Sequence, residues 1–212
     1  MALNRGHDAV TGAARSAAGV PGASQGLDWL WQHLRDVPNP HALDCGPVSP
    51  ATLQLLLRRG AKFYGADLMT PLLQSDARLW DRSGKTPVFL PSEFLNLLPP
   101  ISERSLTVIL SWNLFDLAPR EALPDIVTRL FSLLQPLGLL FCVLREPQAK
   151  TGPEHRWRLE SLTSPRNEAD AKRPFPYPAI TNREIERLLP DASIKTFLTR
   201  SGRREILAMR RE

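Results

Sequence analysis

Cysteine, histidine and long apolar runs are scarce in this chain, and each shortage excludes a class of protein. Only two of the 212 residues are cysteines, so the chain is not a small domain held together by disulfides. We place Cys45 and Cys142 in strands that are not neighbours, and therefore expect two buried free thiols. The apolar runs fall well short of the roughly 18 residues of a membrane-spanning helix, so no span is expected.

Metal-site and leader-sequence signals are missing as well. The four histidines have no spacing with cysteines or acidic residues that would form a metal site, so we expect no bound metal. The first residues lack the apolar stretch of a secretory signal, and the expected location is the cytoplasm. A transit peptide stays open, because Arg5 and Arg15 lie among small residues. Residues 1–25 have no hydrophobic period, which predicts a mobile N-terminal arm.

The positive charge is concentrated in the last third of the chain. The whole chain has 27 Lys and Arg residues against 22 Asp and Glu, a net charge of +5. Residues 145–212 hold 15 of these basic and 10 of these acidic side chains, and so account for the whole excess. Such a surface can attract an acidic partner or a nucleic acid, but a merely solvated surface is the preferred interpretation.

After the arm, segments of strand and helix character alternate along one domain, residues 26–212. Alternation of this kind is typical of a doubly wound, Rossmann-like α/β fold. We predict seven strands in a mostly parallel sheet, with the last two strands forming a C-terminal antiparallel β-hairpin around Ser201-Gly202. The expected strands are residues 41–45, 62–68, 86–90, 104–112, 139–145, 193–199 and 205–210, and the main expected helices are 26–37, 50–60, 71–81, 118–135 and 181–189.

One segment does not follow the alternation. Residues 147–180 contain six prolines, and we predict a long Pro-rich loop there. It would lie over the presumed substrate side of the sheet, with Trp157, Phe175 and Tyr177 as a lid.

The most informative stretch is the unit from His41 to Met69, a strand, a glycine turn, a helix and a second strand. Gly46 ends the first strand and lets the chain turn close to a ligand. Asp67 lies 21 residues after Gly46 at the end of the second strand, where a carboxylate can accept hydrogen bonds from both hydroxyls of a ribose. The unit therefore predicts a nucleotide-like ligand beyond the carboxyl ends of the strands.

Three stretches of the chain resemble the class I S-adenosylmethionine-dependent methyltransferases, and the resemblance extends over roughly residues 26–212. Leu43-Asp44-Cys45-Gly46 is similar to the start of the family's acid-and-glycine loop. Residues 64–68, Tyr-Gly-Ala-Asp-Leu, are similar to its second strand with the ribose-binding acid. Residues 106–113 and 134–141 are similar to its fourth strand and to the turn into its fifth.

This resemblance implies a cofactor, S-adenosylmethionine, and a set of residues around it. It places Ser92 or Glu93 near the adenine, and Ser111 and Trp112 across the crevice from the glycine turn. Asn113 and Asp116 are the candidate catalytic residues, although capping of the next helix explains them equally well. The acceptor is expected to be a small molecule. The implied cofactor-binding residues are Asp44, Gly46, Pro47, Asp67, Leu68, Glu93, Ser111 and Trp112.

Two departures from the family pattern leave a second interpretation open. Val48 and Pro50 stand where the family has its second and third loop glycines. Val48 brings a branched side chain to a place where backbone should contact the ligand, and Pro50 lacks an N–H group. The alternative is a non-catalytic methyltransferase-like module that binds a protein partner through residues 1–25 or 147–180. A nicotinamide-dependent oxidoreductase ranks lower, because the missing glycines matter more for a pyrophosphate.

Overall fold

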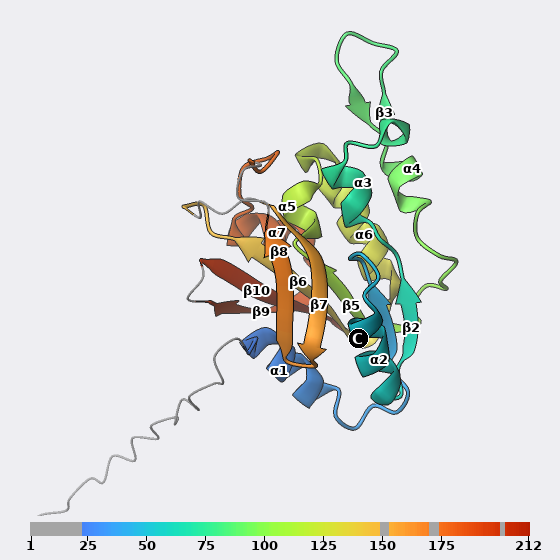
Figure 1. The fold of residues 1–212 in the computed structure, drawn as a ribbon, viewed down its shortest axis with the longest axis vertical. Coiled ribbons are helices and arrows are strands. Elements are labelled where there is room, and N and C mark those ends of the chain that lie inside the picture. The colour runs from blue at the N-terminus through green and yellow to red at the C-terminus, as the bar shows by residue number, and fades with distance from the viewer. Residues whose placement is uncertain (1–22, 149–152, 170–173, 200–201) are drawn as a thin grey trace, which may run out of the picture.

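A six-stranded sheet forms the centre of the molecule (Figure 1). The computed structural model describes residues 23–148, 153–169, 174–199 and 202–212, so most of the predicted arm, residues 1–22, lies outside the described residues. The strand order is β2-β1-β5-β6-β10-β9. The bounds are His41–Asp44 for β1, Lys62–Gly65 for β2, Leu106–Trp112 for β5, Leu134–Arg145 for β6, Ala192–Leu198 for β9 and Arg203–Arg210 for β10.

The pairing confirms the doubly wound architecture. Strands β2, β1, β5 and β6 are parallel to one another, whereas β10 is antiparallel to both β6 and β9. The C-terminal hairpin therefore inserts its second strand, β10, beside β6 and leaves its first strand, β9, at the edge. All seven residues of β5 are buried, as expected of a central parallel strand that is covered on both faces.

The helices begin at residues that suit helix starts. Ser24 caps α1 by accepting a hydrogen bond from the Leu27 N–H, and Pro50 opens α2. Thr181 and Glu184 form a reciprocal capping box at α7. Within the described ranges no helix has the length and hydropathy of a membrane span. The helices are α1 Gln25–His33, α2 Pro50–Arg58, α3 Met69–Leu73, α4 Pro91–Leu95, α5 Leu114–Leu117, α6 Leu123–Leu133 and α7 Asn182–Leu188, with 3-10 turns η1 Ala77–Leu79 and η2 Arg120–Ala122.

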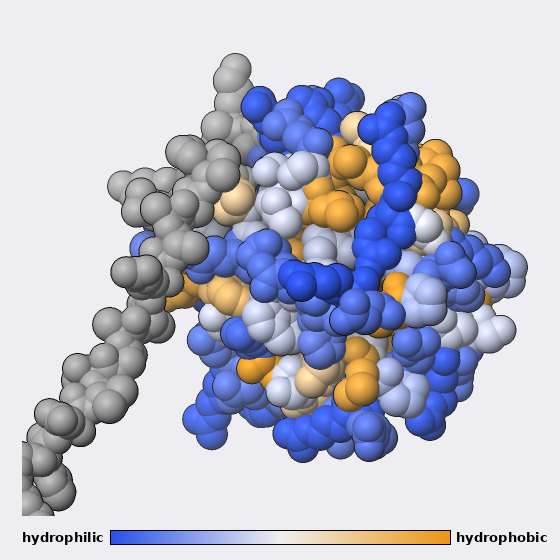
Figure 2. All heavy atoms as spheres, turned by 90° about the horizontal axis from the view of Figure 1, so that it is seen from below, coloured by the Kyte–Doolittle hydropathy of each residue, from blue (hydrophilic) through white to orange (hydrophobic). Residues whose placement is uncertain are grey.

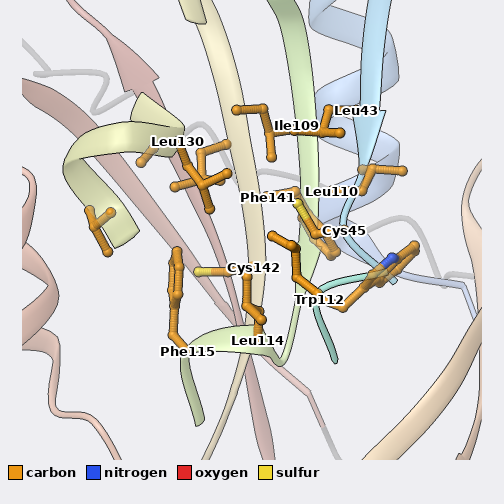
Figure 3. Close-up of a cluster of buried hydrophobic side chains, with 14 of the residues drawn as sticks. Leu43, Cys45, Ile109, Leu110, Trp112, Leu114, Phe115, Leu130, Phe141 and Cys142 are labelled. Atoms are coloured by element: carbon orange, nitrogen blue, oxygen red, sulfur yellow. The ribbon is translucent and has the colours of Figure 1, made fainter. Parts of the chain in front are cut away.

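The core surrounds β5 and β6 on both faces (Figure 3). Leu130 of α6 lies on one side of these strands, and the indole of Trp112 points away from it on the other side. Cys45, directly after β1, and Cys142 on β6 are both buried and free, as expected, and β5 lies between β1 and β6.

The prediction of seven strands was wrong, because the expected third strand does not join the sheet. Val88–Phe89 (β4) pairs instead with Trp80–Asp81 (β3) in a small hairpin that projects from the body (Figure 1). An aromatic contact joins the two strands of this hairpin, since the ring of Phe89 meets that of Trp80 edge-on with centroids 5.2 Å apart. The helix expected over residues 71–81 is correspondingly broken at Ser75, whose φ is 54°. Strand β2 is therefore an edge strand.

The interpretation of residues 147–180 as one long loop was also wrong. Glu154–Ser161 (β7) and Ser164–Ala169 (β8) form an antiparallel hairpin that lies across the sheet next to α2 (Figure 1). Trp157 and Leu159, two residues apart, are both buried, and this period of two is the strand signal that the prolines obscured. The hairpin is attached at its tip, where the Ser24 N–H donates to the Thr163 carbonyl.

The largest exposed apolar side chains lie on different elements, namely Val48 in the turn after β1, Leu57 on α2, Val88 on β4, Leu137 on β6 and Leu198 on β9. On the face that Figure 2 presents, hydrophilic residues border several apolar patches. Isolated apolar residues of this kind are ordinary on a protein surface.

One glycine is required by close backbone packing, which gives a first prediction. A Cβ on Gly138 would lie 2.9 Å from the carbonyl oxygens of both Gln135 and Leu106. We expect Gly138→Ala to lower the free energy of unfolding by about 1–3 kcal/mol in urea denaturation, because backbone must move to accommodate the methyl group. The matched control is Gly84→Ala, where the nearest atom is 3.9 Å away, and equal effects of the two changes would contradict this assignment.

Candidate functional site

The site begins at the turn after β1, where the predicted loop acid and glycine lie together. The Asp44 Oδ1 accepts hydrogen bonds from the Gly46 N–H at 2.9 Å and from the Trp112 Nε1–H at 2.7 Å. A Cβ on Gly46 would lie 3.0 Å from Cδ1 of Trp112. The missing side chain of Gly46 therefore makes room for an indole at the end of β5.

Asp44 is an incompletely satisfied buried acid. Its residue is 1% exposed, and its second oxygen, Oδ2, has no hydrogen-bond partner within the described part of the chain. Burial raises its pKa to about 7, and the nearby Asp67 charge adds to the rise, whereas the hydrogen bonds from Gly46 and Trp112 oppose it. Near neutral pH the carboxyl group is thus divided between its neutral and ionised forms.

Trp112 is covered by a second indole. The rings of Trp112 and Trp157 are stacked with centroids 4.9 Å apart and an interplanar angle of 8°. The Trp157 Nε1–H donates to Asn113 Oδ1 at 2.7 Å, so the candidate catalytic amide supports the hairpin. Trp112 itself has a φ of 50°, which is unusual for a bulky residue. The hairpin therefore covers the indole of Trp112, which itself lies against the glycine turn.

The end of β2 is more open. Asp67 is half-buried, and its Oδ1 accepts a hydrogen bond from the Thr70 N–H at 2.9 Å. Val48 is 57% exposed and packs toward Gly65, where a Cβ would lie 3.0 Å from its Cγ2. The two strand ends are joined by backbone, since the Leu68 N–H donates to the Cys45 carbonyl at 3.1 Å. The Leu68 side chain itself is fully buried in the core.

Two predicted residues lie apart from this cluster. The Ser111 hydroxyl is buried and donates to the Phe141 carbonyl at 3.0 Å, so it is engaged within the sheet. Glu93 is exposed on α4, a helix that packs against η1 and α6. The structure thus brings together Asp44, Gly46 and Trp112 with Asp67 beside them, and it places half-buried Pro47 in the same turn.

Asp116, the second catalytic candidate, lies on α5 at the carboxyl end of the sheet. It is 1% exposed and accepts a hydrogen bond from the Arg145 N–H at 2.8 Å. Burial raises its pKa to about 6, while the charges of Arg145, Arg204 and Arg120 oppose the rise.

Comparison with known proteins identifies the fold. No family model matches the chain, and no curated protein matches it either. Among solved structures, the 1,6-didemethyltoxoflavin-N1-methyltransferase of Burkholderia thailandensis, with bound 1,6-didemethyltoxoflavin and S-adenosylhomocysteine, matches 88% of this chain and 77% of its own at 17% identity and a TM-score of 0.50. A putative type 11 methyltransferase from Sulfolobus solfataricus matches 90% of this chain and 94% of its own at 14% identity, also with a TM-score of 0.50.

The chain has the class I S-adenosylmethionine-dependent methyltransferase fold. The resemblance seen in the sequence is confirmed at this level. At such low identities the similarity shows the fold, and the activity has to be argued from the residues.

Sequence reasoning missed an arginine cluster beside Asp116, formed by Arg120, Arg145 and Arg204. Three guanidinium groups donate to backbone carbonyls of the Pro-rich segment 174–180. Arg145 donates to the Tyr177 carbonyl at 2.5 Å and lies 4.2 Å from the Phe175 ring centroid. The sequence did contain a signal for this cluster. Prolines lack N–H groups, so a Pro-rich segment leaves backbone carbonyls that need donors from elsewhere in the chain. The other two pairs are Arg120 with Pro178 and Arg204 with Ile180.

Proposed function

We propose that this protein is an S-adenosylmethionine-dependent methyltransferase that acts on a small-molecule acceptor. The observation that carries the proposal is the pair of carboxyl groups at adjoining strand ends of a methyltransferase fold. Asp44 follows the hydrophobic part of β1, Asp67 follows β2, and the charge of Asp67 contributes to the raised pKa of Asp44. Two acids so placed suit the two polar ends of the cofactor.

The residues fit the cofactor at both polar ends. Asp67, half-buried and in contact with solvent, would hold the ribose hydroxyls. Asp44 would hold the α-ammonium group, because its buried Oδ2 lacks a donor in the described structure. When bound, the cofactor supplies an electrophilic methyl group. The surrounding chain positions the two reactants and excludes water.

The acceptor side is formed by the ends of β5 and β6. Asn113 and Asp116 lie there, and the arginine-bound segment 174–180 covers it. A carboxyl group whose pKa is about 6 is suited to accept a proton from an acceptor near neutral pH, which is the role we assign to Asp116. The neighbour from Burkholderia thailandensis, whose named substrate is 1,6-didemethyltoxoflavin, supports a small-molecule acceptor.

The first test is binding of S-adenosylhomocysteine, measured by calorimetric titration. We expect micromolar affinity for the natural chain and a loss of at least about tenfold in Asp67→Ala, since a carboxylate that bonds two hydroxyls is removed. Asp36→Ala, which removes an exposed acid in the turn after α1, is the matched control and should leave the affinity unchanged.

The alternative is a non-catalytic module of the same fold. The observation in its favour is that Trp112 lies against Gly46 and is itself covered by Trp157. The similar structures named above are both methyltransferases, so we prefer the enzyme. If the natural chain fails to bind S-adenosylhomocysteine at millimolar concentration, the enzyme proposal is wrong and protein partners should be sought. Binding of nucleic acid by the basic last third stays a less favoured proposal.

A further inference from the structure

The stacked indoles have the geometry of a binding site with its ligand in place. Trp112 provides a flat aromatic face, and Trp157 lies on that face at 4.9 Å with nearly parallel rings. At the ring edge, Asn113 Oδ1 accepts the Trp157 N–H at 2.7 Å. The pair is buried, with Trp157 2% exposed. One face and one in-plane acceptor together define the position of a planar ring.

The residues beneath Trp157 have features of a ligand site rather than of ordinary core. Trp112 holds a φ of 50°, and residues in such sparsely populated conformations are concentrated at binding and active sites. Its indole donates to Asp44, whose other oxygen is buried without a partner in the described chain. That oxygen is the one proposed above to hold the cofactor's ammonium group, so the face of Trp112 would lie beside the cofactor.

Trp157 is carried by an element separate from the sheet. Strands β7 and β8 pair with each other alone and not with the six-stranded sheet. The register of the hairpin shifts between His155 and Arg158, on either side of Trp157, and Arg156 has a φ of 52°. Such irregularities turn a side chain toward a chosen direction. The described anchors nearby include one hydrogen bond from the Leu159 N–H to Thr52 Oγ1 and the bond to Asn113.

We infer that Trp157 is the built-in occupant of a ligand site on Trp112, and that this site takes a planar heteroaromatic ring with an N–H group. The ligand class follows from what the occupant supplies, which is a flat π face and one in-plane N–H donor. The inference rests on the proposed function in one respect, which is that the bound ring is taken to be part of the methyl acceptor. Binding of a ring at Trp112 can be tested without any assumption about methyl transfer.

The test uses indole, which has both features, and 1-methylindole, which lacks the N–H. Trp157→Ala should bind indole at least about tenfold more tightly than the natural chain does, because the internal competitor is gone. It should also prefer indole to 1-methylindole by about fivefold, because Asn113 accepts only from the former. Trp80→Ala, which removes an indole from the β3–β4 hairpin, is the matched control and should show neither effect.

A cavity made by mutation could bind indole trivially, so the natural chain must be examined as well. We expect indole at high millimolar concentration to move the fluorine NMR signal of 5-fluorotryptophan-labelled Trp157 toward that of an exposed indole, with Trp157→Phe used for assignment. Trp157→Phe also keeps an aromatic ring if Trp157→Ala fails to fold.

An unmoved signal in the natural chain, or equal affinities of the Trp157 variant for the two probes, would overturn the inference. A parallel titration with S-adenosylhomocysteine tests the proposed function separately. Loss of that binding with retained displacement of Trp157 would refute the enzyme and leave the aromatic site.

Discussion

Trp112→Ala is expected to lower the free energy of unfolding by about 3–5 kcal/mol, the range for truncating a buried tryptophan. The indole is fully buried, stacks on Trp157 and meets the edge of Phe141 at 5.8 Å between centroids. Its loss also leaves Asp44 without one of its two described donors. The positive φ of this residue gives little compensation, because alanine is disfavoured there as well. Urea denaturation followed by circular dichroism measures the change.

Trp112→Phe separates the contribution of ring packing from that of the hydrogen bond to Asp44. It keeps an aromatic ring against Trp157 and Phe141 but removes the N–H that bonds Asp44 Oδ1. We expect the free energy of unfolding to fall by about 1–3 kcal/mol, the effect of an unpaired buried acceptor.

The double variant Trp112→Ala with Trp157→Ala should be less destabilised than the sum of the single changes, because each single change removes the same stack. Strict additivity would show that the two rings contribute independently.

The sheet could be predicted from the sequence wherever a strand has its own strong pattern. The run from Leu106 to Trp112 is apolar on both faces, and it forms the fully buried β5. The expected strand at residues 86–90 was shorter, and only one of its residues, Phe89, is buried. The ring of Phe89 contacts Trp80 and Phe94, and its strand pairs with β3 and not with the central sheet. A short apolar run does not specify which neighbour it will pack against.

The site could be predicted only in part, because its closure depends on contacts between distant segments. The spacing of Gly46 and Asp67 follows from one strand–helix–strand unit, and the structure places both at adjoining strand ends. The contact of Trp157 with Trp112 joins a hairpin to a strand from another part of the chain, and no local pattern encodes it. The hydrogen bonds from the three arginines to residues 174–180 also join segments that are distant in the sequence.

Asp44→Asn is expected to remove a decline of stability with rising pH. The pKa of Asp44 is raised from 3.8 to about 7 in the folded chain, so between these values the folded state holds a proton that the unfolded chain has lost. Unfolding then releases a proton, and raising the pH favours the unfolded state. Above pH 7 the folded chain carries a buried charge, a cost that this pKa rise places at up to about 4 kcal/mol. Asparagine does not titrate, and its Oδ1 can still accept from Gly46 and Trp112.

The measurement is thermal and urea unfolding of both proteins from pH 4.5 to pH 8.5. The two stability curves should diverge as the pH rises, with the variant more stable by about 2–4 kcal/mol at the upper end. Asp116→Asn should show the same sign over a narrower window, because the pKa of Asp116 reaches only about 6. If the decline persists unchanged in Asp44→Asn, another group is responsible.

The same substitution should act in the opposite direction on cofactor binding. A carboxylate that bonds an ammonium group gains a charge-assisted contact that an amide lacks, so Asp44→Asn should bind S-adenosylhomocysteine at least about tenfold more weakly at pH 8. If Asp44→Asn is more stable but binds the cofactor more weakly, then Asp44 lowers the stability of the fold and serves to bind a ligand. A buried carboxylate with one oxygen unpartnered in the described chain has no benefit for packing. Greater stability with unchanged binding would mean that Asp44 only braces the turn through Gly46 and Trp112. In that case the ligand contacts of this fold would have to come from Asp67 and the open end of β2.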